Sequence, residues 1–344
     1  MHRPRALGVG AASLLVLAAA AGLALISSAA RARDQRALII DTDAGSDDLM
    51  AIAFLLSRDE VRIEAITVAN GLAHVRAGAT NLLRLLELSG RRNIPVYLGS
   101  EKPLRGSAAF PEEWRKLSDT LPGVELPATS RASEPQSAAE YLATRLREPR
   151  ARVRILALGP LTNLAQALER TPSAVRAIEE IVMMGGAVRV PGNLGDGGYF
   201  RTDNKTAEWN MFVDPLAAKI VIDSGAKIRM IPLDATNKVP IDASFLREFE
   251  SQARTPLGHF VAQILEGDRK FIEQGIYSAW DPLAAVALVH PGVVATRPLA
   301  IEIRQQPPEE GRTREIPAGR PNAKVALDAN PTLFREIFFR AFVD

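Results

Sequence analysis

The sequence predicts an α/β fold, in which a single domain is built on an open, mostly parallel sheet with flanking helices. From about residue 36 onward, short apolar segments of strand-like composition alternate with longer segments whose apolar residues recur at helical spacing. The chain of 344 residues is 47% hydrophobic, which is enough to bury a sizeable core. No internal repeat or clean linker divides it, so one domain over 36–344 is the simplest organisation.

The expected elements follow one another in the order that a parallel sheet requires. Strands are expected at residues 36–41, 62–68, 94–99, 152–158, 178–184 and 227–233. Helices are expected at residues 47–57, 77–90, 137–148, 161–170, 215–225 and 281–290, with two more between 242 and 272. Two irregular stretches, 100–135 and 186–207, are longer than most connections and are therefore candidate functional loops.

The first 32 residues have the pattern of a secretory signal peptide. A short basic start, MHRPR, precedes a long apolar run, and Ala30 and Ala32 form an A-x-A cleavage pattern. We therefore expect residues 1–32 to be removed and the protein to be exported, periplasmic or secreted, without membrane contact after cleavage. An uncleaved membrane anchor is the alternative, because about 20 apolar residues can span a bilayer.

Charge and cysteine content exclude several classes of partner and site. The 42 basic and 40 acidic residues nearly cancel, so no basic excess points to nucleic acid. The chain has no cysteine, which excludes disulfides, thiolate metal sites and a lipid-modified cysteine anchor.

Four carboxylates crowd into the segment IIDTDAGSDDLMA, directly after the first expected strand. In sheets of this type, ligands bind at the carboxyl ends of strands, where this segment lies. Asp41 and Asp43 point the same way on an extended chain, and Asp47 and Asp48 open the next helix, where the helix dipole favours negative charge. The dipole does not account for all four. Like charges this close repel unless a cation neutralises them, and oxygen ligands favour a hard divalent ion such as Ca²⁺.

Three familiar motifs fit this segment less well. An EF-hand loop that starts at Asp41 would need acidic residues where Gly45 and Ile52 stand. A phosphate-cradling loop would need a lysine after its glycines, and none is present. A DxD aspartyl-phosphate hydrolase, with Asp41 or Asp43 as the nucleophile, is the most serious rival.

Five segments carry a resemblance when they are taken together and in order. They are DTDAGSDD (41–48), LALGPLTNLAQAL (156–168), VMMGGAV (182–188), AEWNMFVDPLAA (207–218) and AWDPLAA (279–285). The first resembles the D-T-D-P-G-x-D-D signature of the nucleoside hydrolases, which are Ca²⁺-dependent N-ribohydrolases, and the others are similar to further motifs of that family. The resemblance implies a Rossmann-like nucleoside hydrolase fold and cleavage of the N-glycosidic bond of a ribonucleoside to give free base and ribose.

The resemblance also implies a Ca²⁺ site formed by the carboxylates of Asp43, Asp48 and Asp281 and the backbone carbonyl of Leu158. Three carboxylates and one carbonyl leave room for water and substrate oxygens in a shell of about six to eight ligands. The ion would lower the pKa of a water, and Asp43 would act as the general base. An isolated Asp281-Pro282 pair would indicate only a helix N-cap.

Three residues match family positions that hold the ribose hydroxyls: Asp47, Glu208 and Asn210. Three more are candidate sugar contacts: Asn70, Asn193 and Asn204. A helix N-terminal charge for Asp47, and surface polar positions for Glu208 and Asn210, are the simpler interpretations. The sequence reads VANGLAH where the family often has V-x-G-N, so Asn70 competes with His74. Asn193 and Asn204 compete for one sugar contact.

The sequence departs from the family where help for the leaving base is usually supplied. Trp280 stands where many members have a histidine, and the usual H-G-x-x-G loop is missing from residues 100–125. Protonation of the base by histidine is therefore not expected. Stacking of Trp280 and Trp114 on a purine is the expected substitute, with core packing as the competing interpretation for each.

The sequence thus predicts an exported, Ca²⁺-dependent ribonucleoside hydrolase that prefers purine nucleosides and serves purine salvage. A hydrolase of another or modified riboside, and a non-catalytic exported nucleoside- or ribose-binding protein, are the alternatives. Retention of Asp43 argues against the binding protein, because binding alone needs no base. The expected partner is a small-molecule nucleoside, and a homo-oligomer is left open.

Overall fold

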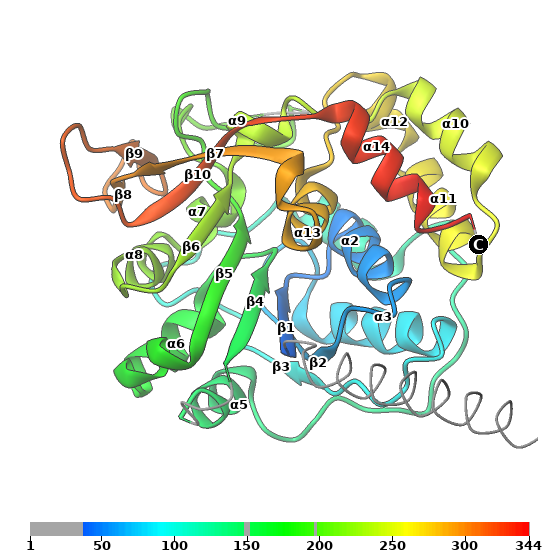
Figure 1. Cartoon of the computed structure of the whole chain (residues 1–344), viewed down its shortest axis with the longest axis horizontal. Coiled ribbons are helices and arrows are strands. Elements are labelled where there is room, and N and C mark those ends of the chain that lie inside the picture. Colours follow the sequence, from blue (N-terminus) through cyan, green and yellow to red (C-terminus); the bar gives the residue numbers. More distant parts are fainter. Residues whose placement is uncertain (1–36, 148–151, 196–197, 344) are drawn as a thin grey trace, which may run out of the picture. The chain divides into compact units, whose positions relative to one another are not determined.

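The computed structural model describes residues 37–147, 152–195 and 198–343. Its main sheet has eight strands in the order β3-β2-β1-β4-β5-β6-β10-β7 (Figure 1). The strands are β1 (Ala37–Thr42), β2 (Ile63–Val68), β3 (Val96–Leu98), β4 (Val153–Ala157), β5 (Ile178–Met184), β6 (Ile228–Ile231), β7 (Val294–Leu299) and β10 (Ala323–Ala329). All neighbours pair in parallel except β7, which is antiparallel to β10. The prediction of an open, mostly parallel sheet is confirmed.

Helices cover both faces of the sheet (Figure 1). Because side chains alternate along a strand, Leu38 and Ile40 of β1 pack into one core and Ile39 into the other. The helices that contribute to the first core are α2 (Ser46–Leu56), α3 (Val75–Leu88), α9 (Leu233–Thr236), α10 (Ala243–Gln252), α11 (Pro256–Gly267), α12 (Arg269–Glu273), α13 (Trp280–Val289) and α14 (Pro331–Arg340). The second core takes residues from α5 (Ala138–Arg145), α6 (Thr162–Arg170) and α8 (Pro215–Asp223), and Met211 from α7 (Trp209–Val213).

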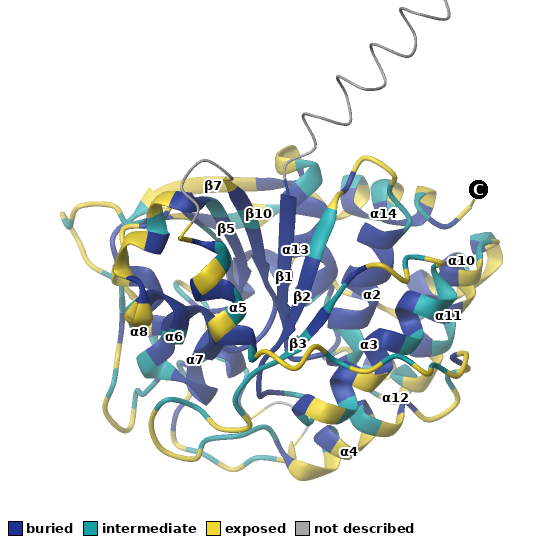
Figure 2. Cartoon of the chain, turned by 90° about the horizontal axis from the view of Figure 1, so that it is seen from below, coloured by how far each residue is buried: buried dark blue, intermediate teal, exposed yellow. Residues whose placement is uncertain are grey.

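The central strands are covered by helices on both sides, which explains why they are continuous apolar runs in the sequence. Every residue of β1 is buried, and Figure 2 shows β1 and most of β5 in the colour of buried residues. Such runs, bounded by turns, made these strands recognisable. Their carboxyl ends meet at one edge of the sheet, where the candidate site lies.

Shorter elements complete the fold. They are α4 (Glu112–Thr120), α7 (Trp209–Val213), the 3₁₀ helices η1 (Pro172–Ala177) and η3 (Pro291–Val293), and a hairpin of β8 (Ile301–Ile303) and β9 (Thr313–Glu315). The sequence showed no periodicity over 100–135, yet α4 forms there. Pro111 followed by two acidic residues is a helix-start signal, but the helix spans only two to three turns and buries just Arg115 and Ser118.

The predicted signal peptide lies outside the described residues. Among the residues that the structure does describe, no helix is both long enough and apolar enough to cross a membrane.

Candidate active site

The carboxylate-rich segment leaves β1 at the carboxyl edge of the sheet. Asp43 follows the last residue of β1, and Ala44, with a φ of 56°, turns the chain into α2. The Thr42 hydroxyl accepts from the Ala44 N–H at 3.0 Å and donates to Asp48 Oδ1. The Gly45 N–H donates to Asp48 Oδ2 at 3.0 Å. These bonds fix the Asp48 carboxylate in the first turn of α2.

Helix α13 brings another carboxylate to the same place. It packs against α2, so Asp281 in its first turn lies beside the start of α2. One carboxylate oxygen from each of Asp47, Asp48 and Asp281 lies within 4.8 Å of the others. No ion pair among the described residues involves these three side chains. The structure therefore concentrates negative charge here without a protein cation to balance it.

Burial and mutual repulsion raise the pKa values of these carboxyl groups. Burial, and then the charge of Asp43, raise the pKa of Asp47 to about 7. Burial with the charges of Asp43 and Asp47 raises the pKa of Asp48 well above its ordinary value. Burial with the charges of Asp48 and Asp47 does the same for Asp281. A bound cation would favour the ionised forms instead.

The donor set fits a divalent metal ion. Asp281 Oδ1 is buried and has no hydrogen-bond partner in the protein. A buried polar atom without a partner costs about 1–3 kcal/mol, and more when it is charged. Clustered carboxylate oxygens are the ligands that hard divalent cations prefer. The three closest carboxylates include Asp47, which was predicted to bind ribose. The predicted ligands Asp43 and Leu158 line the same cavity.

The backbone holds Asp43 on two sides. Its Oδ2 accepts a hydrogen bond from the Leu72 N–H at 2.7 Å. A Cβ atom at Gly71 would lie 1.9 Å from Asp43 Oδ2, and a Cβ at Gly159 would lie 2.8 Å from Asp43 Cβ. Two glycines therefore allow the chain to close around this carboxylate. Burial raises the pKa of Asp43, although hydrogen bonds from Asp48 and from backbone N–H groups oppose the shift.

Glu208 and Asn210 lie on the cavity wall beside the carboxylates. Glu208 caps α7, and its carboxylate accepts from the N–H groups of Asn210 and Gly186, both at 2.9 Å. Burial raises the pKa of Glu208 to about 7. The Asn210 side-chain amide donates to the Leu158 carbonyl at 2.8 Å. The structure thus brings together three of the residues predicted to contact metal or ribose.

Aromatic side chains form a large part of the remaining cavity lining. Trp114 and Trp280, the two tryptophans expected to stack on a base, both line it, together with Phe110, Trp209 and Phe271. Trp209 stacks on Phe110 at 4.8 Å between ring centroids, and Trp114 meets Trp209 edge-on at 5.7 Å. The cavity lining therefore combines carboxylates with aromatic rings, which suits a ligand with one polyhydroxylated part and one flat apolar part.

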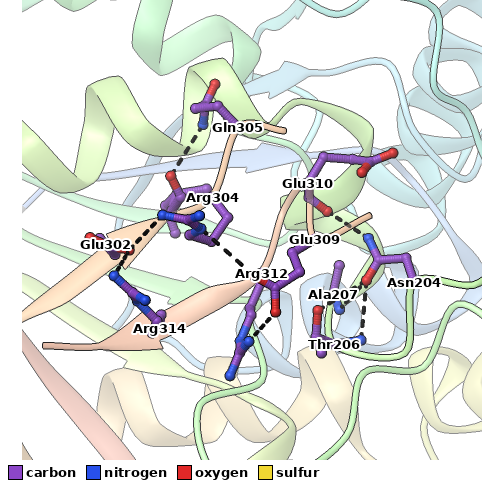
Figure 3. A network of polar contacts seen from close by, with 11 residues as sticks. Asn204, Thr206, Ala207, Glu302, Arg304, Gln305, Glu309, Glu310, Arg312 and Arg314 are labelled. Atoms are coloured by element: carbon purple, nitrogen blue, oxygen red, sulfur yellow. Dashed lines mark hydrogen bonds and ion pairs between the residues drawn. The ribbon is translucent and has the colours of Figure 1, made fainter. Parts of the chain in front are cut away.

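Two predicted sugar contacts are used elsewhere in the protein. Asn70 Oδ1 accepts from Arg115 Nη2 at 3.0 Å, and Asn70 is not among the residues that line the cavity. Figure 3 shows Asn204 tied to Ala207 and to the carbonyl of Glu310 beside the β8–β9 hairpin, also outside the cavity. Of the competing pair, Asn193 lines the cavity.

His74, the other candidate near residue 70, is held at the start of α3. Its Nδ1 lies 2.7 Å from Asp119 Oδ2, and its backbone N–H donates to Asp119 Oδ1 at 2.8 Å. These contacts hold the C-terminal end of α4 against the loop after β2. Trp114 lies in the first turn of the same helix. His74 is not among the residues that line the cavity.

Sequence reasoning missed a buried group that lines the cavity. Asp268 accepts a hydrogen bond from the Tyr277 hydroxyl at 2.9 Å and one from Ser46, and burial raises its pKa to about 6. Asp268, Tyr277 and Ser46 all line the cavity. Ser46 directly precedes Asp47, and Tyr277 lies three residues before Trp280. The position of Tyr277, four residues before Asp281, was the only available signal. Asp268 gave none, because it lies at a helix junction in a stretch assigned to two helices.

The family model for the inosine-uridine preferring nucleoside hydrolases matches residues 38–336. The chain belongs to this family. It is therefore a hydrolytic N-ribosyl enzyme that acts on nucleosides, and the predicted family, enzyme class and fold are confirmed. The match to the nucleoside hydrolase family model covers nearly all of the residues that the structure describes.

The nucleoside hydrolases that are similar to this chain differ in the base that their names specify. Uridine nucleosidase 1 of Arabidopsis thaliana is 32% identical over 273 residues, 78% of each chain. The pyrimidine-specific ribonucleoside hydrolase RihA of Citrobacter koseri is 37% identical over 229 residues, 67% of this chain and 70% of RihA. The solved purine-preferring ribonucleoside hydrolase of Gardnerella vaginalis is 26% identical, with a TM-score of 0.76 over 90% of this chain and 98% of its own. Membership of the family therefore does not determine the base preference, which depends on the residues of the site.

Proposed function

We propose that this nucleoside hydrolase is a Ca²⁺-dependent, exported enzyme that cleaves purine ribonucleosides in preference to pyrimidine ones. The observation that carries the proposal is the composition of the cavity lining. Asp47, Asp48 and Asp281 converge there, and aromatic side chains that include Trp114 and Trp280 line the same cavity. Export and a role in purine salvage rest on the signal-like pattern of residues 1–32 and on the purine preference.

The carboxylates of Asp43, Asp48 and Asp281 and the Leu158 carbonyl would hold the ion, with Asp47 beside them. Bound Ca²⁺ would supply Lewis-acid chemistry and hold oxygen ligands in place. Calcium is favoured over magnesium because the protein itself offers several carboxylates and a carbonyl, whereas Mg²⁺ usually keeps several waters and binds through one or two carboxylates.

The chain's own residues would divide the work of hydrolysis. Asp43 accepts a proton from the attacking water, for which its raised pKa suits it. Glu208 and Asn210 orient the ribose hydroxyls, since both lie on the cavity wall and are held by backbone hydrogen bonds. The C1′–N bond breaks as the water oxygen bonds to C1′, and the base leaves with the electron pair of that bond and takes a proton from solvent.

The purine preference rests on the aromatic side chains that line the cavity. Trp280 lines the cavity, its neighbour Asp281 belongs to the carboxylate cluster, and its ring lies 5.0 Å from that of Tyr277. Stacking of an aromatic pair contributes about 0.5–1.5 kcal/mol beyond burial, and a purine offers more ring area than a pyrimidine. A several-fold preference for purines is the expected consequence.

A nucleoside panel with and without chelator tests the proposal. Purified protein would be incubated with inosine, adenosine, guanosine, uridine and cytidine, and free ribose would be assayed. We expect ribose release that EGTA abolishes and added Ca²⁺ restores, with kcat/KM several-fold higher for the purines. Release that is insensitive to chelator would refute the metal, and equal efficiency on all five would refute the base preference.

A further inference from the structure

A hairpin that lies outside the cavity contacts the segment that carries Glu208. It consists of β8, β9 and the turn between them (residues 301–315), and none of these residues, all of which the structure describes, lines the cavity. Ile301 and Ile303 of β8 are buried in the second core, which anchors this strand. Beyond β8 the chain returns beside Ala207, the residue before Glu208 (Figure 3). The hairpin therefore connects the second core with this segment.

Gly311 of the hairpin packs against the backbone of α7. A Cβ atom here would lie 2.7 Å from Phe212 Cα and 2.8 Å from the Met211 carbonyl oxygen, closer than ordinary van der Waals contact. The φ of Gly311 is 80°, a conformation that favours glycine. Because Glu208 caps α7 and Asn210 lies in its first turn, this close approach supports both side chains from outside the cavity.

The next two hairpin residues meet the other backbone neighbours of Glu208. Arg312 forms an antiparallel β-bridge with Ala207. Thr313 is buried, and its Oγ1 would lie 2.8 Å from a Cβ atom at Gly186. The N–H of Gly186 in turn donates to the Glu208 carboxylate at 2.9 Å. The hairpin thus contacts three backbone segments that fix Glu208: the helix that it caps, the residue before it and an N–H group that binds its carboxylate.

Asn204 ties the segment before Glu208 to the same hairpin. Its Oδ1 accepts from the N–H groups of Thr206 at 3.1 Å and Ala207 at 3.2 Å, and its Nδ2 donates to the carbonyl of Glu310 at 2.8 Å (Figure 3). Only an amide side chain both accepts and donates in this arrangement. Because Asn204 is buried, water does not replace these bonds when they are lost.

We propose that the β8–β9 hairpin, through Gly311 and Asn204, is a positioning element for ribose recognition. It holds Glu208 and Asn210 in the cavity wall without touching the substrate. This inference rests on the proposed function, in which these two side chains orient the ribose hydroxyls. Loss of the hairpin contacts therefore weakens the interaction with the sugar, whatever the base, and leaves the base preference unchanged.

Gly311→Ala tests the contact with α7 in the full chain at saturating Ca²⁺. The added Cβ would lie 2.7 Å from Phe212 Cα, where ordinary contacts begin near 3.4 Å, so α7 must shift by less than 1 Å. A misplacement of about 1 Å can cost about 100-fold in rate, so we expect this smaller shift to lower kcat/KM about 10-fold. The inhibition constant of the product D-ribose should rise, while the ratio of kcat/KM for inosine to that for uridine stays at its wild-type value.

Gly225→Ala is the matched control for Gly311→Ala. The φ of Gly225 is 81°, and no atom lies within 4 Å of its added Cβ, so this variant carries the same backbone strain without the contact. Its kinetics should match those of the wild type. Kinetics of Gly311→Ala that equal those of Gly225→Ala, or a changed ratio of inosine to uridine, would overturn the inference.

Asn204→Asp separates the link to the hairpin from the local turn. Aspartate keeps an oxygen that accepts from Ala207 but offers no donor to the Glu310 carbonyl, so the inhibition constant of D-ribose should rise as it does in Asn204→Ala. Asn330→Ala is the control, because it removes the hydrogen bond from the Leu333 N–H that caps α14 at a place that does not line the cavity. That variant should lose thermal stability and keep wild-type inhibition by D-ribose. Wild-type inhibition in Asn204→Asp would overturn the link to the hairpin.

Asn210→Ala, measured in the same series, separates failure of this inference from failure of the proposed function. Weaker inhibition by D-ribose in Asn210→Ala but not in Gly311→Ala would overturn the role of the hairpin and leave the proposed ribose contact standing. Wild-type inhibition by D-ribose in Asn210→Ala would refute the proposed ribose contact, and the role of the hairpin with it.

Discussion

Replacing Gly71 by alanine should disable the enzyme while leaving it folded. A Cβ at this position would lie 1.9 Å from Asp43 Oδ2 and 2.5 Å from Asp43 Cβ and Cγ, where ordinary contacts begin near 3.4 Å. Rotation of the carboxylate does not remove the overlap, because the Asp43 Cβ itself is too close. The segment that carries Asp43 must therefore move, and the 2.7 Å bond from the Leu72 N–H to Oδ2 must lengthen or break.

The displacement needed, about 1 Å, sets the size of the effect. A misplacement of about 1 Å at a reacting group can cost about 100-fold in rate, and complete loss of a positioned base costs about 10² to 10⁴. We therefore expect kcat/KM to fall at least 100-fold, which corresponds to about 2.7 kcal/mol of transition-state stabilisation. Ca²⁺ affinity should weaken as well, because Asp43 lies beside Asp48.

The assay is ribose release from inosine at saturating Ca²⁺, with circular dichroism and the melting temperature measured on the same samples. Gly292→Ala is the matched control. No atom lies within 4 Å of its added Cβ, so activity should stay within about twofold of wild type. A folded Gly71→Ala enzyme with kcat/KM within threefold of wild type would show that the position of Asp43 does not matter for catalysis.

Three further predictions concern the base, the stack and the metal. Asp43→Asn should lower kcat by about 10² to 10⁴ even in metal-loaded protein, because an amide cannot accept the water's proton; near-normal single-turnover rates would place the base elsewhere. Trp280→Ala should lower kcat/KM for inosine, adenosine and guanosine several-fold more than for uridine and cytidine, and an equal loss on all five would indicate packing alone. Calorimetric titration should show Ca²⁺ affinity rising from pH 5.5 to 7.5, because burial and repulsion raise the pKa of Asp47 to about 7 and protons compete with the ion below it. Without Ca²⁺, the raised pKa makes the native state bind more protons than the unfolded state, so the free energy of unfolding should fall as pH rises through this range. A Ca²⁺ affinity and a free energy of unfolding that do not change with pH would contradict the raised pKa.

The regular elements of the sheet could be predicted because their signals are local. Strand β1 was expected at residues 36–41 and is observed at Ala37–Thr42, since a strand buried on both faces must be apolar throughout. The C-terminal strands β7 and β10 were not expected. Most of β7 is exposed and contains Pro298, so it carries no apolar alternation. Pairing of β10 with β6 joins residues about 95 positions apart, and no local pattern encodes such a pairing.

The carboxylate end of the site was also visible in the sequence. Asp43, Asp47 and Asp48 lie within six positions, and an excess of negative charge after a buried strand points to a cation whatever the fold. The motif resemblance then added Asp281, which lies more than 230 positions away. Local chemistry and matched motifs were enough for this half.

The tertiary structure alone decided which of the polar candidates reach the cavity. Asn70 and Asn204 looked as suitable as Asn193, but Arg115 engages Asn70 and the β8–β9 hairpin engages Asn204. An amide binds whichever partner the fold brings within hydrogen-bond distance, and that partner is distant in sequence. The same holds for the pairing of Asp268 with Tyr277 and for the aromatic part of the cavity lining, to which α4, α7 and α12 contribute. By itself the sequence determined the chemistry of the carboxylates, whereas packing between distant segments determined which other side chains line the cavity.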